Sequence, residues 1–174
     1  MITHPFSKMH ALGNDFSVFY GSLSILENLT DKIKDFSNRQ AGVGFDQLLF
    51  ITPQENNAFY FYIFNADGSK ASQCLNGARC VARFLLEHKY VDEPVFTISN
   101  QSGAMRVNAE DFSAITLSVQ NTTTFFDEII TLPNLPYSFK KISIGNNHVV
   151  TQINSKKTLT LDLQALLKVT QDMA

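Results

Sequence analysis

NADGSKASQCLNGARCVARFL, residues 65–85, is the stretch that decides the fold. It follows an aromatic and β-branched run at 59–64 that predicts a strand, and its Asp67-Gly68 pair is a strong hairpin signal. The next residues predict a helix that begins beside Cys74. One apolar face of this helix follows the i, i+3, i+4, i+7 rule through Ala78, Val81, Ala82 and Leu85.

Cys74 stands where the predicted helix begins. A helix start offers unpaired backbone N–H groups and the positive end of the macrodipole, and both stabilise an anion such as a thiolate or a carboxylate. Cys74 is therefore a candidate acid/base or nucleophilic group, although on context alone a small buried residue is an equal alternative. Cys80 lies in mid-helix, too far along for easy disulfide geometry, and we expect it to be part of the core.

Four segments carry a resemblance to a known family. NADGS with Gln73-Cys74 and NGARCVARF, FSKMHALGNDF at 6–16 and AGVGFDQLLF at 41–50 are similar to motifs of the diaminopimelate epimerases. IGNNHVV at 144–150 is a weaker fourth match. Together the matches span residues 6 to 150.

This resemblance implies a fold and a chemistry. The family inverts a carbon next to a carboxylate without pyridoxal phosphate or a metal ion, here between LL- and meso-diaminopimelate in lysine and peptidoglycan precursor synthesis. Two cysteines face each other across the substrate: a thiolate removes the α-proton and a thiol delivers a proton to the opposite face. The expected fold is α+β, an epimerase-like half-barrel whose antiparallel-rich, curved mixed sheet wraps around a central helix.

The family's functional residues map onto positions of this sequence. Cys74 corresponds to the first cysteine, and the backbone of Leu75 and Asn76 would hold the α-carboxylate. His148 matches a histidine that tunes the cysteine pair. The substrate-contacting amides would be Asn14, Gln47, Asn65, Asn76 and Asn146. Such amides donate and accept without adding charge, which suits a zwitterionic substrate, but singly each is also an ordinary turn or strand residue.

Three positions depart from the family pattern. Leu75 replaces a glycine, whose loss could crowd the carboxylate pocket or strain the turn. Asn147 replaces a proline. The family's second cysteine lies beyond IGNNH, whereas the two cysteines of this sequence are Cys74 and Cys80. We therefore expect residues 1–120 to be a first half-domain and 121–174 an incomplete start of a second pseudo-symmetric half, inactive alone as an epimerase.

Composition narrows the class of protein. The net charge is −2 and basic residues do not cluster, which argues against nucleic-acid binding. No window is long and apolar enough for a transmembrane helix, and two cysteines without a signal peptide predict a reducing cytoplasm. The sequence predicts no cofactor and no metal, an amino-acid substrate and a possible homodimer.

The remaining elements are predicted from local patterns. A short helix capped by Thr30 is expected over 30–38, a crossover over 121–136 and a last helix over 161–169. Strands are expected at 7–20, interrupted by the LGND turn, and at 47–52, 95–99, 105–108, 114–119, 140–144 and 148–153.

Two other functions remain open. One is a related cofactor-independent racemase that acts on a different amino acid. The other is a degenerate, non-catalytic half-protein that binds a ligand or a partner, which Leu75 and the missing cysteine favour.

Overall fold

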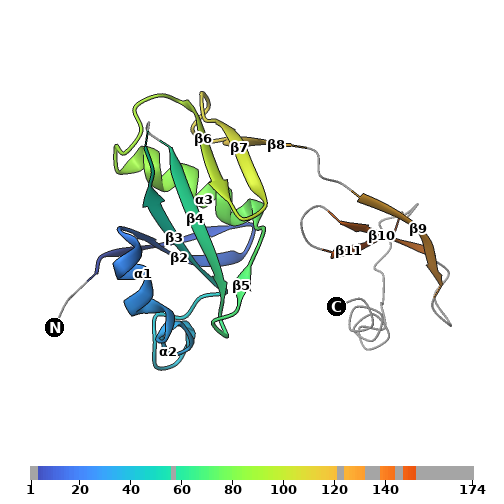
Figure 1. Ribbon diagram of the computed structural model, residues 1–174, viewed down its shortest axis with the longest axis horizontal. Helices are drawn as coiled ribbons and strands as arrows, with labels where there is room; N and C mark the ends of the chain where they lie inside the picture. The colour runs from blue at the N-terminus through green and yellow to red at the C-terminus, as the bar shows by residue number, and fades with distance from the viewer. Residues whose placement is uncertain (1–3, 56–57, 121–123, 132–137, 144–146, 152–174) are drawn as a thin grey trace. The chain divides into compact units, whose positions relative to one another are not determined.

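The computed structural model describes residues 4–55, 58–120, 124–131, 138–143 and 147–151 (Figure 1). The chain divides into two compact units, Met1–Gln120 and Asn121–Ala174, and each is described by itself. The helix predicted over 161–169 lies outside the described residues. That the second unit begins a pseudo-symmetric half stays a prediction.

The first unit is a curled mixed sheet with three helices in its described part. Its 8 strands follow the order β1-β2-β3-β4-β6-β7-β8, with β5 paired to β4. The β2–β3 and β4–β6 pairs are parallel and the other pairs antiparallel. The elements are β1 (Phe6–Ala11), β2 (Asn14–Tyr20), α1 (Leu23–Thr30), α2 (Ile33–Ser37), β3 (Gln47–Pro53), β4 (Phe59–Asn65), β5 (Lys70–Ala71), α3 (Leu75–Glu87), β6 (Val95–Asn100), β7 (Gly103–Asn108) and β8 (Thr116–Val119).

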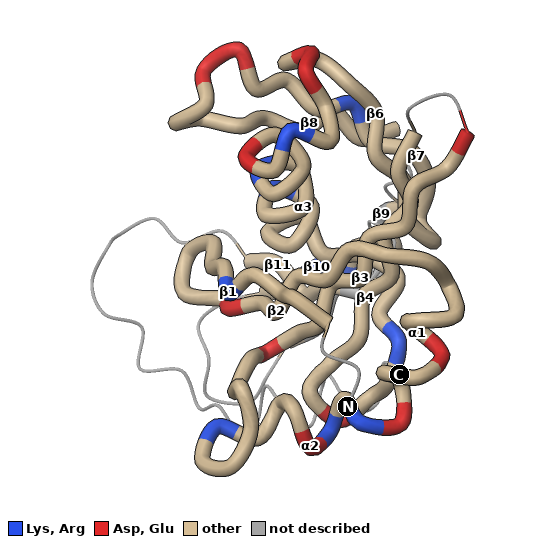
Figure 2. Tube along the Cα trace, turned by 90° about the vertical axis from the view of Figure 1, so that its left-hand side faces the viewer, with Lys and Arg blue, Asp and Glu red and all other residues tan. Residues whose placement is uncertain are grey.

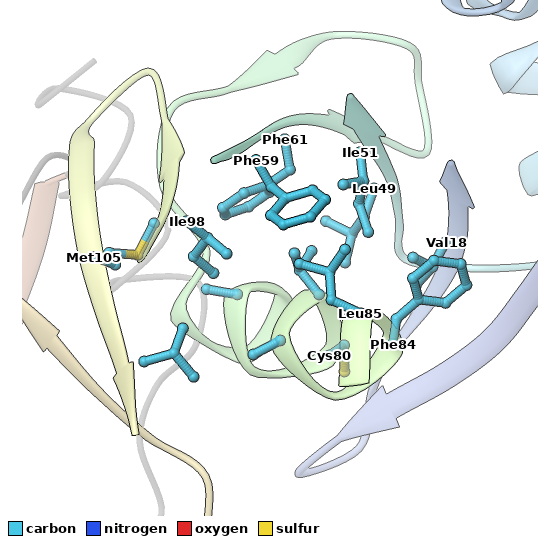
Figure 3. Packing of buried hydrophobic residues seen from close by; sticks show 14 of the residues in the cluster. Val18, Leu49, Ile51, Phe59, Phe61, Cys80, Phe84, Leu85, Ile98 and Met105 are labelled. Atoms are coloured by element: carbon cyan, nitrogen blue, oxygen red, sulfur yellow. The ribbon is translucent and has the colours of Figure 1, made fainter. Parts of the chain in front are cut away.

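Helix α3 lies within the curl of this sheet and supplies the centre of the larger core (Figure 3). Its predicted apolar face is confirmed, since Ala78, Val81, Ala82 and Leu85 are fully buried. Strand residues that point toward the helix meet this face, among them Val18, Leu49, Ile51, Phe61 and Ile98. The expected half-barrel around a central helix is therefore confirmed.

Helices α1 and α2 cover the other face of the sheet. Leu26, Leu29 and Ile33 pack there against a second cluster that includes Phe50 and Phe64. Because side chains alternate along a strand, β3 sends Leu48 and Phe50 to this cluster and Leu49 and Ile51 to the α3 side. Burial on both faces explains why β3 reads as a continuous apolar run.

The helix predicted over 30–38 was wrong in its bounds and its cap. Thr30 ends α1, and its hydroxyl donates to the Leu26 carbonyl at 2.9 Å instead of capping a following helix. Lys32 precedes α2 as the N-cap, without a side-chain capping bond. Threonine can bond backward to the preceding turn as readily as forward, so its presence alone did not distinguish a helix end from a helix start.

A two-residue turn joins β1 to β2 at the register pair Ala11–Asn14. Leu12 and Gly13 both adopt positive φ, 53° and 86°, as a primed hairpin turn requires. Leu12 is 90 % exposed and is strained there, because a leucine side chain disfavours the left-handed region.

The second unit contains a three-stranded antiparallel sheet of order β11-β10-β9. Its strands are β9 (Thr124–Thr131), β10 (Ser138–Ser143) and β11 (Asn147–Val150). The predicted crossover over 121–136 was wrong for Thr124–Thr131, whose threonines and aromatic and branched residues form a strand. In the described part of the chain, no helix is long and apolar enough to cross a membrane.

Candidate active site

Cys74 is the N-cap of α3, as the sequence predicted. Its backbone is extended, with φ −154° and ψ 100°, and its Sγ accepts a hydrogen bond from the Gly77 N–H at 3.2 Å. The first bond of the helix runs from the Ala78 N–H to the Cys74 carbonyl at 2.8 Å. The N–H groups of Leu75 and Asn76 consequently have no acceptor within the helix, and the Asn76 N–H interacts with the Cys74 thiol.

Two opposing effects act on the Cys74 thiol. Burial raises its pKa, while the N–H groups of Gly77 and Asn76 and the positive charge of Arg79 lower it. The helix start thus favours the thiolate as predicted, but the net direction of the pKa is upward because burial is the larger effect.

Cys80 occupies a different environment. It is 4 % exposed within the α3 core, and burial raises the pKa of its thiol to about 11, with a further contribution from Cys74. Both cysteines are free, in agreement with the expectation that they do not form a disulfide. The expectation that Cys80 belongs to the core is confirmed.

Asn14 brings the β1–β2 turn to the helix start. Its side-chain oxygen accepts from the Cys74 thiol at 3.8 Å, across a sequence separation of 60 residues. Its side-chain nitrogen donates to Asp46 Oδ2 at 3.0 Å.

Gln47 and Asn65 lie at the same end of the sheet as Asn14. Asn14 and Gln47 begin the parallel strands β2 and β3, and Asn65 ends the antiparallel strand β4 opposite Gln47. Gln47 Nε2 donates to Asn65 Oδ1 at 2.9 Å, and Asn65 Nδ2 donates to the Ser69 hydroxyl at 3.0 Å. Gln47 Oε1 is buried and accepts no hydrogen bond from the described residues. The strand directions thus place three of the predicted amides at the same end of the sheet.

The other predicted site residues lie in different environments or outside the described residues. Leu75 adopts no positive φ and packs partly buried against the α3 core, so the predicted backbone strain is absent at this position. The side-chain oxygen of Asn76 accepts from the Arg79 guanidinium one turn along the helix. Asn146 lies outside the described residues. His148 is half-buried in β11, opposite Ile142, and its role toward Cys74 stays a prediction.

Sequence reasoning missed the residues that hold the segment before Cys74. Asn100 is 5 % exposed, and its side-chain nitrogen donates to Gln73 Oε1 at 3.1 Å. The Ser102 hydroxyl donates to the Ser72 carbonyl at 2.7 Å. Residues 100–103, NQSG, connect the predicted strands at 95–99 and 105–108, and no local signal in this segment indicates that it supports the helix start.

A charged cluster, formed by Lys8, Asp15, Arg39 and Asp46, adjoins Asn14. Arg39 bridges the two carboxylates, at 2.7 Å from Asp15 and 2.8 Å from Asp46, and Lys8 pairs with Asp15 at 2.8 Å. A basic and an acidic segment meet beside β1 in Figure 2. The Arg39 guanidinium, assisted by Lys8 and the Asp46 N–H, holds the pKa of Asp15 well below its usual range.

Comparison with known proteins identifies the family of the chain. Residues 6–122 match the protein-family model of diaminopimelate epimerase. The chain belongs to the diaminopimelate epimerase family. A diaminopimelate epimerase of Coxiella burnetii (strain RSA 493 / Nine Mile phase I) is 36% identical over 167 residues, which cover 85% of this chain and 59% of the relative. The chain thus spans 59% of the length of this curated relative.

Solved structures show the same fold at low sequence identity. A probable proline racemase from Agrobacterium radiobacter K84 aligns with a TM-score of 0.63 and 17% identity, over 86% of this chain and 52% of that one. A hydroxyproline epimerase from Agrobacterium vitis aligns with a TM-score of 0.62 and 16% identity, over 84% and 50% of the two chains. Membership of the diaminopimelate epimerase family and these structural likenesses agree on the half-barrel.

Proposed function

We propose that the protein is a pyridoxal-phosphate-independent epimerase that interconverts LL- and meso-diaminopimelate, in the cytoplasm, for lysine and peptidoglycan precursors. Its family and its 36% identity to curated diaminopimelate epimerases support this function. The single observation that carries the mechanism is the placement of Cys74 as the N-cap of α3, with its thiol against Asn14. A homodimer is the proposed assembly.

In this mechanism the Cys74 thiolate removes the α-proton of the substrate. The proton moves to Sγ, and the electron pair of the broken C–H bond moves toward the α-carboxylate. The N–H groups of Leu75 and Asn76 lack acceptors within the helix, so they are suited to stabilise the negative charge that develops there. Protonation of the opposite face completes the inversion.

The amides at this end of the sheet orient the substrate. Asn14, Gln47 and Asn65 can donate to its carboxylate and accept from its ammonium groups without adding a charge near the thiol. The buried Gln47 Oε1 is an acceptor without a partner among the described residues, and an N–H donor of the substrate would satisfy it.

Cys80 does not serve as the second acid. It lies six positions along the helix, and its side chain is packed in the α3 core. The group that protonates the opposite face must therefore be a residue other than the two cysteines of this sequence. The two cysteines of this sequence thus supply one of the two proton-transfer groups in the proposed mechanism.

The test is to incubate the 174-residue chain with LL-diaminopimelate in D₂O and to follow α-deuterium and stereochemistry together. We expect slow deuterium uptake without inversion, because one thiol exchanges a proton on one face only. Uptake should be lost in Cys74→Ala and kept in Cys80→Ala. Deuterium uptake no faster than in Cys74→Ala would contradict the role of Cys74, and Cys74-dependent inversion at enzyme-like rates would contradict the one-thiol assignment.

A substrate panel tests the amino-acid specificity. L-proline and trans-4-hydroxy-L-proline, run beside LL-diaminopimelate, represent the related racemases. We expect Cys74-dependent exchange with diaminopimelate alone. Faster exchange with either cyclic amino acid would assign the protein to a different racemase.

A further inference from the structure

The Asn14 side chain lies between two groups with opposite hydrogen-bonding demands. On one side is the Asp46 carboxylate, 3.0 Å from Asn14 Nδ2, and on the other the Cys74 thiol, 3.8 Å from Asn14 Oδ1. An ionised carboxylate only accepts hydrogen bonds, so the amide must present its NH₂ group to Asp46. Its oxygen is then left facing the sulfur.

The Asp46 carboxylate is itself held from several directions. Oδ1 accepts from Arg39 at 2.8 Å, and Oδ2 accepts from the Asp15 N–H at 3.0 Å. The Asp46 N–H donates to Asp15, at 3.0 Å from the Asp15 carbonyl oxygen and 2.9 Å from its Oδ1. Lys8 pairs with Asp15 and also donates to the Gly44 carbonyl. These bonds tie the start of β2 to the start of β3, and they leave the Asp46 carboxylate little freedom to turn.

We propose that Asp46 is a positioning residue, which fixes the Asn14 side-chain amide with its oxygen toward the Cys74 thiol. This inference rests on the proposed proton-transfer role of Cys74. Because the amide oxygen accepts from S–H, it stabilises the protonated thiol and directs the S–H bond toward Asn14. The reversed amide would present N–H groups to the sulfur and would stabilise the thiolate instead.

The first experiment measures the pH dependence of iodoacetamide labelling at Cys74 in the full 174-residue chain, with site-resolved mass spectrometry. Asp46→Asn replaces an obligate acceptor with an amide that both donates and accepts. The Asn14 side-chain amide can then rotate so that its oxygen and its NH₂ group exchange places. We expect the Cys74 labelling midpoint to fall by about half to one pH unit, a gain of roughly three- to tenfold in thiolate near neutral pH. An unchanged or higher midpoint would overturn the proposal.

Loss of a negative charge could lower the midpoint without any change of orientation. Other charges near the two sites are Arg39, Asp15 and Lys8 around Asp46, and Arg79 beside Cys74. The double variant with Asn14→Ala separates the two effects, because a purely electrostatic shift persists without the amide and an orientation effect does not. We expect the Asp46→Asn shift to disappear in the Asn14→Ala background. A shift of equal size there would overturn the positioning role.

Two controls test whether a change in the Cys74 midpoint is specific to Asp46. Glu27→Gln removes an exposed carboxylate from α1 and should leave the Cys74 midpoint unchanged. Cys80 labelling reports loosening of the fold, since this thiol is buried and should stay slow in every variant.

A second measurement does not depend on the variants folding. In the parent chain, the NMR signals of the Asn14 NH₂ group should shift as carboxylates are protonated in acid and should change little as Cys74 ionises in base. The reverse pattern would mean that the NH₂ group faces the sulfur, and would contradict the proposal. Neither measurement uses diaminopimelate, so failure here is distinct from failure of the proposed epimerase activity.

Discussion

At the scale of single residues, the two cysteines show how one helix can hold one residue type in two environments. Cys74 is at the cap, where backbone N–H groups and Arg79 oppose the effect of burial on its pKa. Cys80 is in the core, where burial raises the pKa to about 11. The difference follows from position along α3 and not from sequence neighbours.

We predict that iodoacetamide labels Cys74 faster than Cys80 in the folded chain. Raised pKa values leave little thiolate at neutral pH, so both labelling rates should increase with pH. The labelling rate of Cys80 should increase at the higher pH, near 11. At pH 8 we expect a difference of roughly tenfold or more. Site-resolved mass spectrometry measures both rates, with circular dichroism to verify folding, and equal rates would contradict the prediction.

Leu12 offers a test of local strain. A leucine with φ 53° at a turn is disfavoured, whereas asparagine tolerates this conformation and is common in primed turns. Leu12→Asn should raise the free energy of unfolding by about 0.5–1 kcal/mol in urea titrations followed by far-ultraviolet circular dichroism. Leu23→Asn, at a half-exposed leucine that begins α1, is the matched control and should give no gain. A gain from both variants would mean that removing exposed apolar surface, and not turn strain, is the cause.

Prediction at this scale succeeded where a residue's chemistry is local. The position of Cys74 follows from capping and periodicity in one continuous segment. Asn14, Gln47 and Asn65 could be proposed only through family resemblance, because each alone is an ordinary turn or strand residue. The Asn100–Gln73 bond joins residues 27 positions apart, and nothing near either one indicates the pairing.

At the scale of elements, the charged cluster fastens three segments: β1 through Lys8, the start of β2 through Asp15, and the segment from α2 to β3 through Arg39 and Asp46. Single exposed ion pairs contribute little to stability, but this cluster is a network whose central carboxylate, Asp15, is 20% exposed. Its effect should therefore be measurable.

Asp15→Asn should lower the free energy of unfolding by about 1 kcal/mol at pH 7. The folded-state pKa of Asp15 is lowered, so its contribution is present above the unfolded-state value near 4 and is lost as pH falls below it. The deficit of the variant should consequently shrink between pH 5 and pH 2. Urea titrations across this range measure it, with Glu27→Gln as the control, and a deficit that is independent of pH would contradict the assignment.

The elements differ in how far the sequence could predict them. The strands around 47–52 and 59–64 and helix α3 have strong periodicity and clear boundaries, and the structure confirms them. Helices α1 and α2 are short, and Thr30 is the last residue of α1, two residues before the N-cap of α2, so its capping signal could be assigned to either helix. Strand β9 was missed because its polar neighbours and the prolines after it are typical of a connection.

At the scale of the whole molecule, the two hydrophobic clusters formed by the described residues lie within the first unit. Every member of the α3 core and of the cluster under α1 and α2 precedes residue 120. Independent stability of this unit therefore follows from where the apolar side chains are buried.

We predict that a polypeptide of residues 1–120 folds cooperatively without the second unit. Its extrapolated free energy of unfolding should match that of the 174-residue chain within the roughly 10–15% uncertainty of urea extrapolation. Far-ultraviolet circular dichroism follows the transition, because the chain contains no tryptophan. Loss of a cooperative transition in the shorter polypeptide would show that its core depends on residues beyond 120.

The fold class could be predicted at this scale, because alternating strands around one amphipathic helix, together with four family motifs, agree on a half-barrel. The strand order could not, since the parallel pairs β2–β3 and β4–β6 depend on contacts between distant segments. Local sequence signals predict that a segment forms a strand, but they do not determine which other strand it pairs with.

The separation of 60 residues between Asn14 and Cys74 also sets an order of events during synthesis. Asn14 leaves the ribosome first, and its partner follows only after β3, β4 and the hairpin have been made. Closing so long a segment costs more entropy than forming the β1–β2 hairpin, so the turn is ready before the thiol arrives. The contact between Asn14 and Cys74 thus forms late, after strands β1 to β5 have been synthesised.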